Sequence, residues 1–185
     1  MKKVLVVVDM QNDFVTGPLG SRQAMKIVPN IKKKIEHYLA NNNSIIYTYD
    51  THHEDYLQTQ EGRSLPIPHC IEYTDGWRVV PELTQLALKN PTQIHTLTKH
   101  TFGSMDLVNT ITDIVTEAEE YAVEFIGVCT DICIVTNALL LKTALPECDI
   151  SVDASCCAGT SREKHLAALK VLESCQIKIS NMKSY

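Results

Sequence analysis

The sequence predicts a single α/β domain over residues 1–185, a three-layer αβα sandwich built on a six-stranded, mainly parallel sheet. Two observations support this fold class. Short runs rich in Val and Ile alternate with helical patterns along the whole chain, and such alternation is typical of parallel sheets with right-handed crossovers. The length of 185 residues suits one domain. We find no linker, internal repeat or low-complexity tract in it.

Six short apolar runs are expected to form the strands. The first and the fourth are almost continuously apolar, as expected for strands that helices cover on both faces. In chain order the runs are residues 3–9, 44–50, 93–99, 121–128, 148–153 and 176–180.

Helical patterns fill most of the connections. Apolar residues recur at helical spacing in residues 28–42 and again in residues 105–118, and a Ser opens the helix expected from residue 161. Residues 131–145 are apolar almost all round, so this helix should lie in the core or at a subunit interface. The connection over residues 51–80 has little regular pattern, and a loop this long in a compact domain is usually functional.

Composition excludes several classes of function. The chain is 44% hydrophobic with a net charge of −5 and no basic cluster, so we expect neither nucleic-acid nor membrane binding. The N-terminal apolar run ends at Asp9, too soon for a signal peptide, which indicates a cytoplasmic protein. Its cysteines should therefore be free, and no Cys-x-x-Cys pair suggests a structural zinc site. Four of them receive no functional assignment: Cys148, Cys156, Cys157 and Cys175.

Chemically useful side chains follow four of the expected strands. Asp9, Asp50 and Lys99 end the first three, and Cys133 stands just after the fourth, in the first turn of the next helix. Because ligands bind at the carboxyl ends of strands in open parallel sheets, these four groups should meet at one edge. Each alone could be an ordinary solvated residue or, for the thiol, core packing. Their joint occurrence favours a catalytic site.

A thiol becomes a nucleophile when its thiolate is stabilised. The helix N-terminus and the Lys99 ammonium could lower the pKa of Cys133, and Asp9 could move the proton. Backbone N–H groups between Cys129 and Cys133 could bind an oxyanion. Cys129 itself is interpreted as a small residue packed in the turn.

Several segments carry a resemblance to a known family. The sequence resembles the isochorismatase-like cysteine hydrolases, and within them the nicotinamidases, over nearly the whole chain. The matching segments are "VVVDMQNDF" (6–14), "YTYDTH" (47–52), "PHC" (68–70), "TKHTFGSM" (98–105) and "GVCTDICIVTNA" (127–138). The resemblance implies the isochorismatase-like hydrolase fold.

The resemblance implies a catalytic triad of Asp9, Lys99 and Cys133, with a thioester intermediate. Because the family's isochorismatase branch lacks the thiol, its presence here favours hydrolysis of an amide or carbamoyl group. The family also has a cis peptide bond that matches Val128–Cys129, aiming amides at the oxyanion. Asp13 and Asp131 are expected to support the turn near Asp9 and the nucleophile's helix.

The resemblance also implies a divalent metal ion, Zn, Fe or Mn, bound by Asp50, His52 and His69. Glu61 is the expected fourth ligand, with His53 and Glu54 as competitors. A polar loop with solvated histidines is the alternative.

The implied substrate is a small amide, nicotinamide, converted to nicotinate and ammonia for NAD salvage by a protein that forms homo-oligomers. Phe14 matches an aromatic residue of the family's pocket. However, "LPIPHC" lacks the aromatic residue that nicotinamidases often carry there, although Trp77 or Tyr73 could replace it. Another small amide, ureido or carbamoyl substrate therefore stays open, as does a non-catalytic binding protein.

Overall fold

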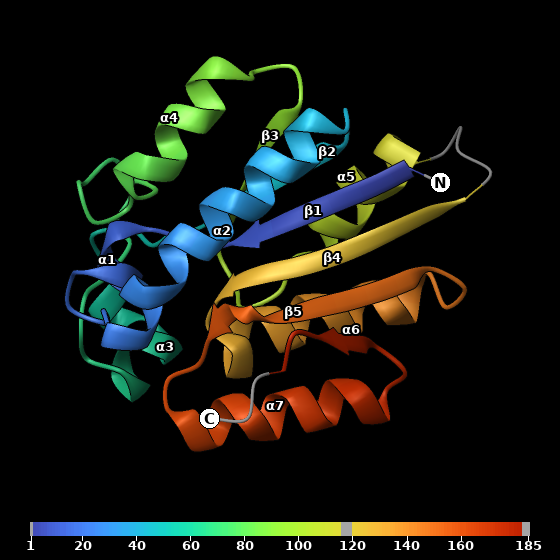
Figure 1. Cartoon of the computed structure of the whole chain (residues 1–185). Coiled ribbons are helices and arrows are strands. Elements are labelled where there is room, and N and C mark those ends of the chain that lie inside the picture. The colour runs from blue at the N-terminus through green and yellow to red at the C-terminus, as the bar shows by residue number, and fades with distance from the viewer. Residues whose placement is uncertain (1, 116–119, 183–185) are drawn as a thin grey trace.

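A computed structural model describes residues 2–115 and 120–182 and confirms the predicted α/β class. Six strands form one sheet in the order β3-β2-β1-β4-β5-β6, and every strand pairing in it is parallel. This arrangement places β1 and β4 at the centre of the sheet (Figure 1). The strands are β1 (Lys2–Val8), β2 (Ser44–Asp50), β3 (Ile94–Lys99), β4 (Tyr121–Val128), β5 (Asp149–Ala158) and β6 (Lys178–Ser180).

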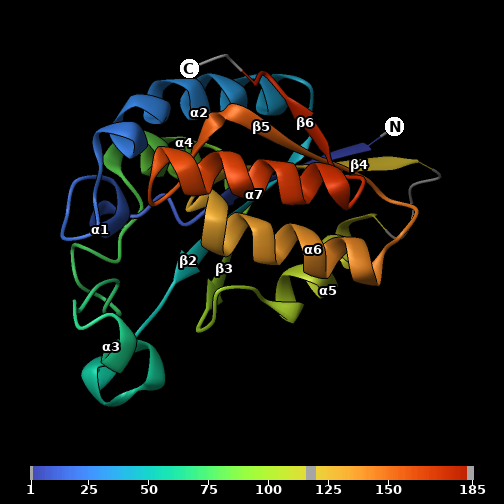
Figure 2. The ribbon, with the colours of Figure 1, turned by 90° about the horizontal axis from the view of Figure 1, so that it is seen from below.

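Helices cover both faces of the sheet (Figures 1 and 2). One layer holds α1 (Asn12–Val15), α2 (Arg22–Ala40) and α4 (Pro81–Lys89), and the other holds α5 (Met105–Val115), α6 (Val135–Ala144) and α7 (Arg162–Ser174). Side chains of β1 alternate between the two cores, since Leu5 and Val7 face the first layer and Val4 and Val6 face the second. None of the helices in the described ranges is long and apolar enough to cross a membrane.

Several elements differ from the prediction. Helix α2 begins at Arg22, earlier than expected, because the Ser21 side chain accepts a hydrogen bond from Ala24 N and caps it. Helix α4 was not predicted, although Pro81 in its first turn is a helix-start signal. Strand β5 continues to Ala158, so Cys156 and Cys157 lie within a strand instead of after it.

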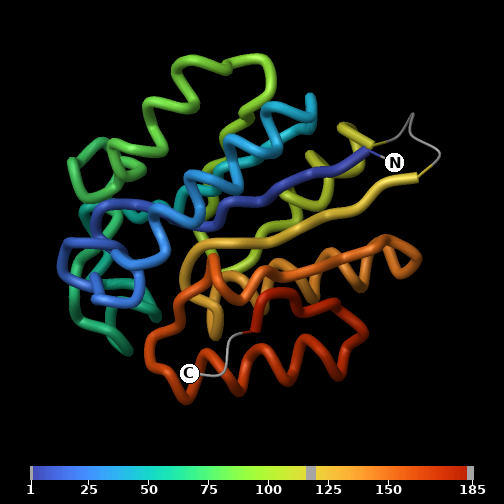
Figure 3. The backbone as a smooth tube through the Cα atoms, in the orientation of Figure 1, coloured from blue at the N-terminus to red at the C-terminus, as the bar shows by residue number. Residues whose placement is uncertain are grey.

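The carboxyl ends of the central strands meet the irregular connection between β2 and α4 at one edge of the sheet (Figure 3). This connection contains only a 3₁₀ turn, η1 (Tyr56–Gln58), and a short helix, α3 (Gln60–Ser64). At the same edge Gly127 has φ +116°, and a Cβ there would lie 2.2 Å from the carbonyl oxygen of Val8. Only glycine therefore lets β4 pass this close to β1 just before the turn that carries Cys133.

Candidate functional site

Asp9, Lys99 and Cys133 lie together in the interior at this edge. The Lys99 Nζ atom is 2.8 Å from Asp9 Oδ2 and 3.6 Å from Cys133 Sγ. All three side chains are buried, with exposed fractions of 0%, 2% and 5% for Asp9, Lys99 and Cys133. The lysine thus stands between an acid and a thiol in a site with little access to water.

Thr48 holds the Asp9 carboxylate in place. Its hydroxyl donates to Asp9 Oδ1 at 2.6 Å and accepts from Asp9 N at 3.1 Å. Thr48 precedes Asp50 by two positions on β2, so the two side chains share a face of the sheet. We did not identify Thr48 from the sequence, although this spacing was a usable signal.

Burial and charge set the protonation of the three groups. Burial raises the pKa of Asp9 although the ammonium of Lys99 opposes the change. The pKa of Lys99 is raised because its carboxylate neighbours outweigh its burial. The pKa of Cys133 is raised well above its ordinary value, mainly by burial and then by the charge of Asp9, which outweigh Lys99. The expected lowering of the pKa of Cys133 is therefore wrong.

The start of the helix that follows Cys133 differs from expectation, whereas the cis peptide bond agrees with what the resemblance implied. Cys133 lies in a π-helical turn, η2 (Thr130–Ile134), and α6 begins only at Val135. The peptide bond between Val128 and Cys129 is cis. Asp131 does not cap the helix, because its carboxylate accepts hydrogen bonds from the backbone N–H and the hydroxyl of Thr160. Asp131 thereby ties the turn to the segment before α7.

A second cluster of ligating atoms adjoins the triad. The ligand atoms of Asp50, His52 and His69 all lie within 4.8 Å of one another, and all three residues are buried. His52 Nε2 is 3.1 Å from Asp50 Oδ2, and His69 Nε2 is 3.6 Å from the same oxygen. Glu61 Oε1 completes the group at 3.6 Å and 3.8 Å from the two imidazole nitrogens.

These residues fit a divalent metal ion. In a tetrahedral site with ligands about 2.1 Å from the ion, neighbouring donor atoms stand roughly 3.4 Å apart, close to the separations here. The Nδ1 atom of His69 lies 2.9 Å from the carbonyl of Ile67, which leaves its Nε2 lone pair directed at the cluster. Although burial alone would raise the pKa of Asp50, hydrogen bonds from His52 and His69 and the charge of Lys99 lower it, so Asp50 is an anion of the kind that divalent cations bind.

The two competing ligands are exposed, and two aromatic rings pack on the histidines. His53 is exposed and lies 3.6 Å from Glu72, and Glu54 is also exposed. Phe14 packs on His69 with ring centroids 5.4 Å apart. Tyr56, which we did not identify from the sequence, packs on His52 at 4.7 Å and on His69 at 5.1 Å. Two aromatic rings therefore flank the histidine pair.

Asp50 belongs to both clusters. Its Oδ1 atom accepts from Lys99 Nζ at 3.0 Å, and its Oδ2 atom faces both imidazoles. The register of the sheet explains this, because Asp50 and Lys99 are partners at the ends of β2 and β3. The group of Asp9, Lys99 and Cys133 and the group of Asp50, His52 and His69 thus form one continuous site.

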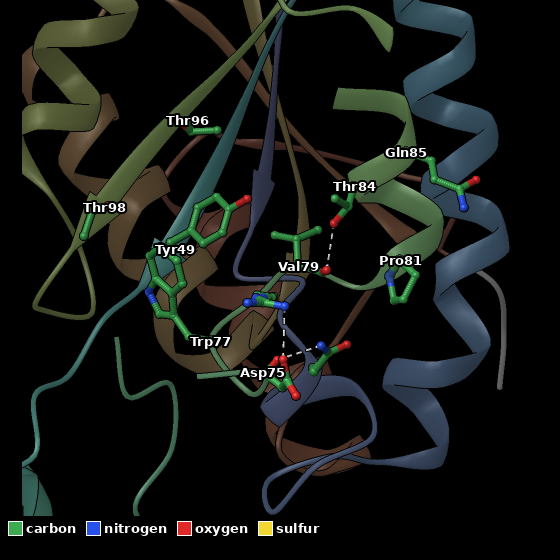
Figure 4. Close-up of a pocket in the computed structure, with 11 residues that line it drawn as sticks. Tyr49, Asp75, Trp77, Val79, Pro81, Thr84, Gln85, Thr96 and Thr98 are labelled. Atoms are coloured by element: carbon green, nitrogen blue, oxygen red, sulfur yellow. Dashed lines mark hydrogen bonds and ion pairs between the residues drawn. The ribbon is translucent and has the colours of Figure 1, made fainter. Parts of the chain in front are cut away.

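Trp77 lies elsewhere. Figure 4 shows it beside Tyr49, with Thr96 and Thr98 of β3 nearby, in a cavity of about 710 Å³. Tyr49 precedes Asp50, so the two side chains point to opposite faces of the sheet. The Trp77 indole N–H donates to Thr51 Oγ1 at 2.7 Å. We therefore assign the rings beside the histidines to Phe14 and Tyr56, and Tyr73 is largely exposed.

Asp13 supports the loop that carries His69. Its Oδ2 atom accepts from Cys70 N at 2.7 Å, and Cys70 has φ +47°. A Cβ on Gly76 would lie 2.1 Å from the same carboxylate. Asp13 therefore acts on the loop after His69, whereas we expected it to support the turn near Asp9.

Comparison with known proteins gives a consistent result. The sequence model of the isochorismatase domain family matches residues 3–184 of this chain. Nicotinamidase 1 of Arabidopsis thaliana is 28% identical over 180 residues, covering 88% of this chain and 72% of the relative. The crystal structure of the nicotinamidase/pyrazinamidase PncA of Bacillus subtilis has a TM-score of 0.86 at 23% identity, with 98% and 100% of the two chains covered. The pyrazinamidase of Pyrococcus horikoshii, solved in complex with zinc, has a TM-score of 0.79 at 26% identity, with 97% and 98% covered.

Proposed function

The chain belongs to the isochorismatase family of hydrolases, and from this we propose that it is a cysteine amidohydrolase that converts nicotinamide to nicotinate and ammonia. The observation that supports this most is the shared carboxylate of Asp50. It joins the Asp9–Lys99–Cys133 triad to a cluster of one further acid and two imidazoles. A nucleophile and a ring-orienting metal site within reach of one small substrate suit an aromatic carboxamide.

In the first half of the reaction, the Asp9 carboxylate takes the proton of the Cys133 thiol. The raised pKa of Asp9 makes it a stronger base than an ordinary carboxylate, while Lys99 stabilises the thiolate that forms. The sulfur attacks the carboxamide carbon, and the amide N–H groups of Cys129 and Cys133 receive the developing oxyanion. Protonated Asp9 then gives its proton to the leaving nitrogen, and ammonia departs from a thioester.

In the second half, water replaces ammonia. Asp9, again a carboxylate, takes a proton from the water as its oxygen attacks the thioester carbon. The C–S bond breaks, the carboxylic acid is released, and protonated Asp9 returns its proton to the Cys133 sulfur. Lys99 keeps its charge throughout because its pKa is raised.

Asp50, His52, His69 and Glu61 would hold a divalent cation. When bound, the cation would act as a Lewis acid for the pyridine nitrogen and orient the ring. Phe14 and Tyr56 flank the two histidines and would limit the space around the ring. The exposed Ile67 stands in the segment where an aromatic residue is expected, so a different small amide is the second candidate.

Replacing Asp9 should have opposite effects on the thiol and on catalysis. In Asp9→Asn we expect faster alkylation of Cys133 by iodoacetamide at pH 7–8 in metal-free protein, together with loss of amide hydrolysis. The charge of Asp9 raises the thiol pKa, and each unit by which that pKa falls increases the thiolate fraction about tenfold. Mass spectrometry of the Cys133 peptide measures the rate.

The parent protein should show alkylation that still rises above pH 9, because the thiol pKa is raised from that value. Asp149→Asn, which removes an exposed carboxylate at the other end of the sheet, is the control and should match the parent. Slower alkylation in Asp9→Asn would contradict the charge arrangement described here.

The proposed function is tested by ammonia release from nicotinamide by purified protein, before and after chelation and after addition of Zn²⁺, Fe²⁺ or Mn²⁺. We expect release that chelation removes and one of the metals restores. Release from a ureido or carbamoyl compound, with none from nicotinamide, would favour the second candidate. Absence of hydrolysis for all these substrates in metal-loaded protein would refute both.

A further inference from the structure

Gln11 occupies an unusual place beside the site. Strand β1 ends at Val8, and the chain leaves the sheet at Asp9, whose φ is +50°. Neighbouring β2 continues to Asp50. On its other side β2 still pairs with β3, since Thr51 N donates to the carbonyl of Lys99. The backbone N–H and C=O of Asp50 therefore point toward the place that β1 has left.

The side-chain amide of Gln11 fills that place. Its Oε1 atom accepts from Asp50 N at 2.8 Å, and its Nε2 atom donates to Asp50 O at 2.8 Å. A second Nε2 hydrogen bond, also 2.8 Å, reaches the carbonyl of Trp77. Gln11 is fully buried, with 0% exposure. Its amide thus makes the two hydrogen bonds that the backbone of a continued β1 would have made with Asp50, plus one to the loop ahead of α4.

We infer that Gln11 is a positioning residue, whose side-chain amide takes the place of the β1 backbone and fixes the backbone of Asp50. With that backbone held, one carboxylate oxygen meets Lys99 and the other meets His52 and His69. The backbone N–H of Gln11 donates to the carbonyl of Asp9 at 2.7 Å, whereas its side chain bonds to the backbones of Asp50 and Trp77. The influence of the side chain on Lys99 and on the imidazoles therefore passes through Asp50. The inference about metal affinity stands on this geometry, and its consequence for catalysis rests on the proposed function.

A merely structural role predicts something different. Loss of buried hydrogen bonds would lower the melting temperature and leave the metal affinity of the folded protein unchanged. Loss of positioning would change the coordination itself. Removal of an outer-shell partner of a metal site typically costs 10–100-fold in metal affinity or activity.

The test compares Gln11→Met with Gln93→Met. Methionine keeps the approximate volume and removes all three side-chain hydrogen bonds of Gln11. Gln93 is a matched control, because its Nε2 also donates to two backbone carbonyls, those of Leu39 and Asn43, but at the opposite ends of the strands. Zn²⁺ affinity is measured by chelator competition, Co²⁺ binding by its visible absorption spectrum, and stability by thermal unfolding of the metal-free proteins.

We expect Gln11→Met to bind Zn²⁺ 10–100-fold more weakly and to shift the Co²⁺ spectrum, with Gln93→Met like the parent. Parent-like Zn²⁺ affinity and Co²⁺ spectrum in Gln11→Met would overturn the inference, whatever its melting temperature. If Gln11→Met does not fold, Gln11→Glu keeps an acceptor for Asp50 N and loses both donated bonds, and the same two outcomes apply to it. These readouts need no substrate, so failure of nicotinamide as a substrate leaves them unaffected.

Discussion

Replacement of Cys133 by Ala is expected to reduce ammonia release from nicotinamide by a factor on the order of 10⁴–10⁶, as for other enzymes that lose a nucleophile. The Cys133 sulfur accepts a hydrogen bond from Lys99 Nζ at 3.6 Å. The measurement is kcat at saturating nicotinamide in metal-loaded protein. Mass spectrometry of acid-quenched samples should show a thioester on the parent and none on the variant.

Cys148→Ala is the matched control. Cys148 is also a buried thiol, but it lies next to the start of β5, at the opposite edge of the sheet. The activity of the Cys148→Ala variant should equal that of the parent at a temperature where both proteins are folded. Activity of Cys133→Ala within tenfold of the parent would exclude covalent catalysis by this thiol.

Replacement of Lys99 by Met should remove activity and also destabilise the protein. Lys99 lies between two buried carboxylates, at 2.8 Å from Asp9 and 3.0 Å from Asp50. Without the ammonium, both anions lose their main compensating charge. Removal of one partner of a buried ion pair typically lowers the free energy of unfolding by about 3–5 kcal/mol. Chemical denaturation of metal-free protein measures this loss.

Two further variants separate the charge effect from general damage. Lys99→Met combined with Asp9→Asn should recover part of the lost stability without recovering activity, because one uncompensated carboxylate has been removed. Lys178→Met breaks an exposed ion pair with Asp149, which should cost about 0–1 kcal/mol. If the double variant were less stable than Lys99→Met, the electrostatic explanation would be wrong.

The sequence was sufficient for the fold class and for the edge of the sheet where the polar groups gather. The carboxyl ends of parallel strands lie at the same edge of a sheet, so the strand pattern of the sequence alone was enough to group Asp9, Asp50 and Lys99. Glu61 could not be separated from His53 and Glu54, because the path of an irregular loop depends on long-range packing. Tyr56 was missed for the same reason.

The direction of the pKa shift of Cys133 could not be predicted from residue types, because it depends on burial and on the positions of nearby charges. A helix start and a lysine predicted a low thiol pKa, whereas complete burial and the nearby Asp9 charge reverse the direction. Gln11 was likewise unrecognised, since its role depends on where β1 stops relative to β2. Residue types indicated which groups could take part in the chemistry. Burial sets the pKa of Cys133, and strand register sets the position of Gln11 beside Asp50.

The two oxygens of Asp50 also constrain how such a site can evolve. If the site binds a metal ion as proposed, a lineage that gave up this ion could replace His52 and His69, since neither makes a hydrogen bond to Lys99 in the described structure. It could not release position 50 so easily, because a buried lysine would lose one of its two counterions. An acid at position 50 is therefore a poor indicator that a related protein needs a metal ion. The presence of both histidines is a better indicator.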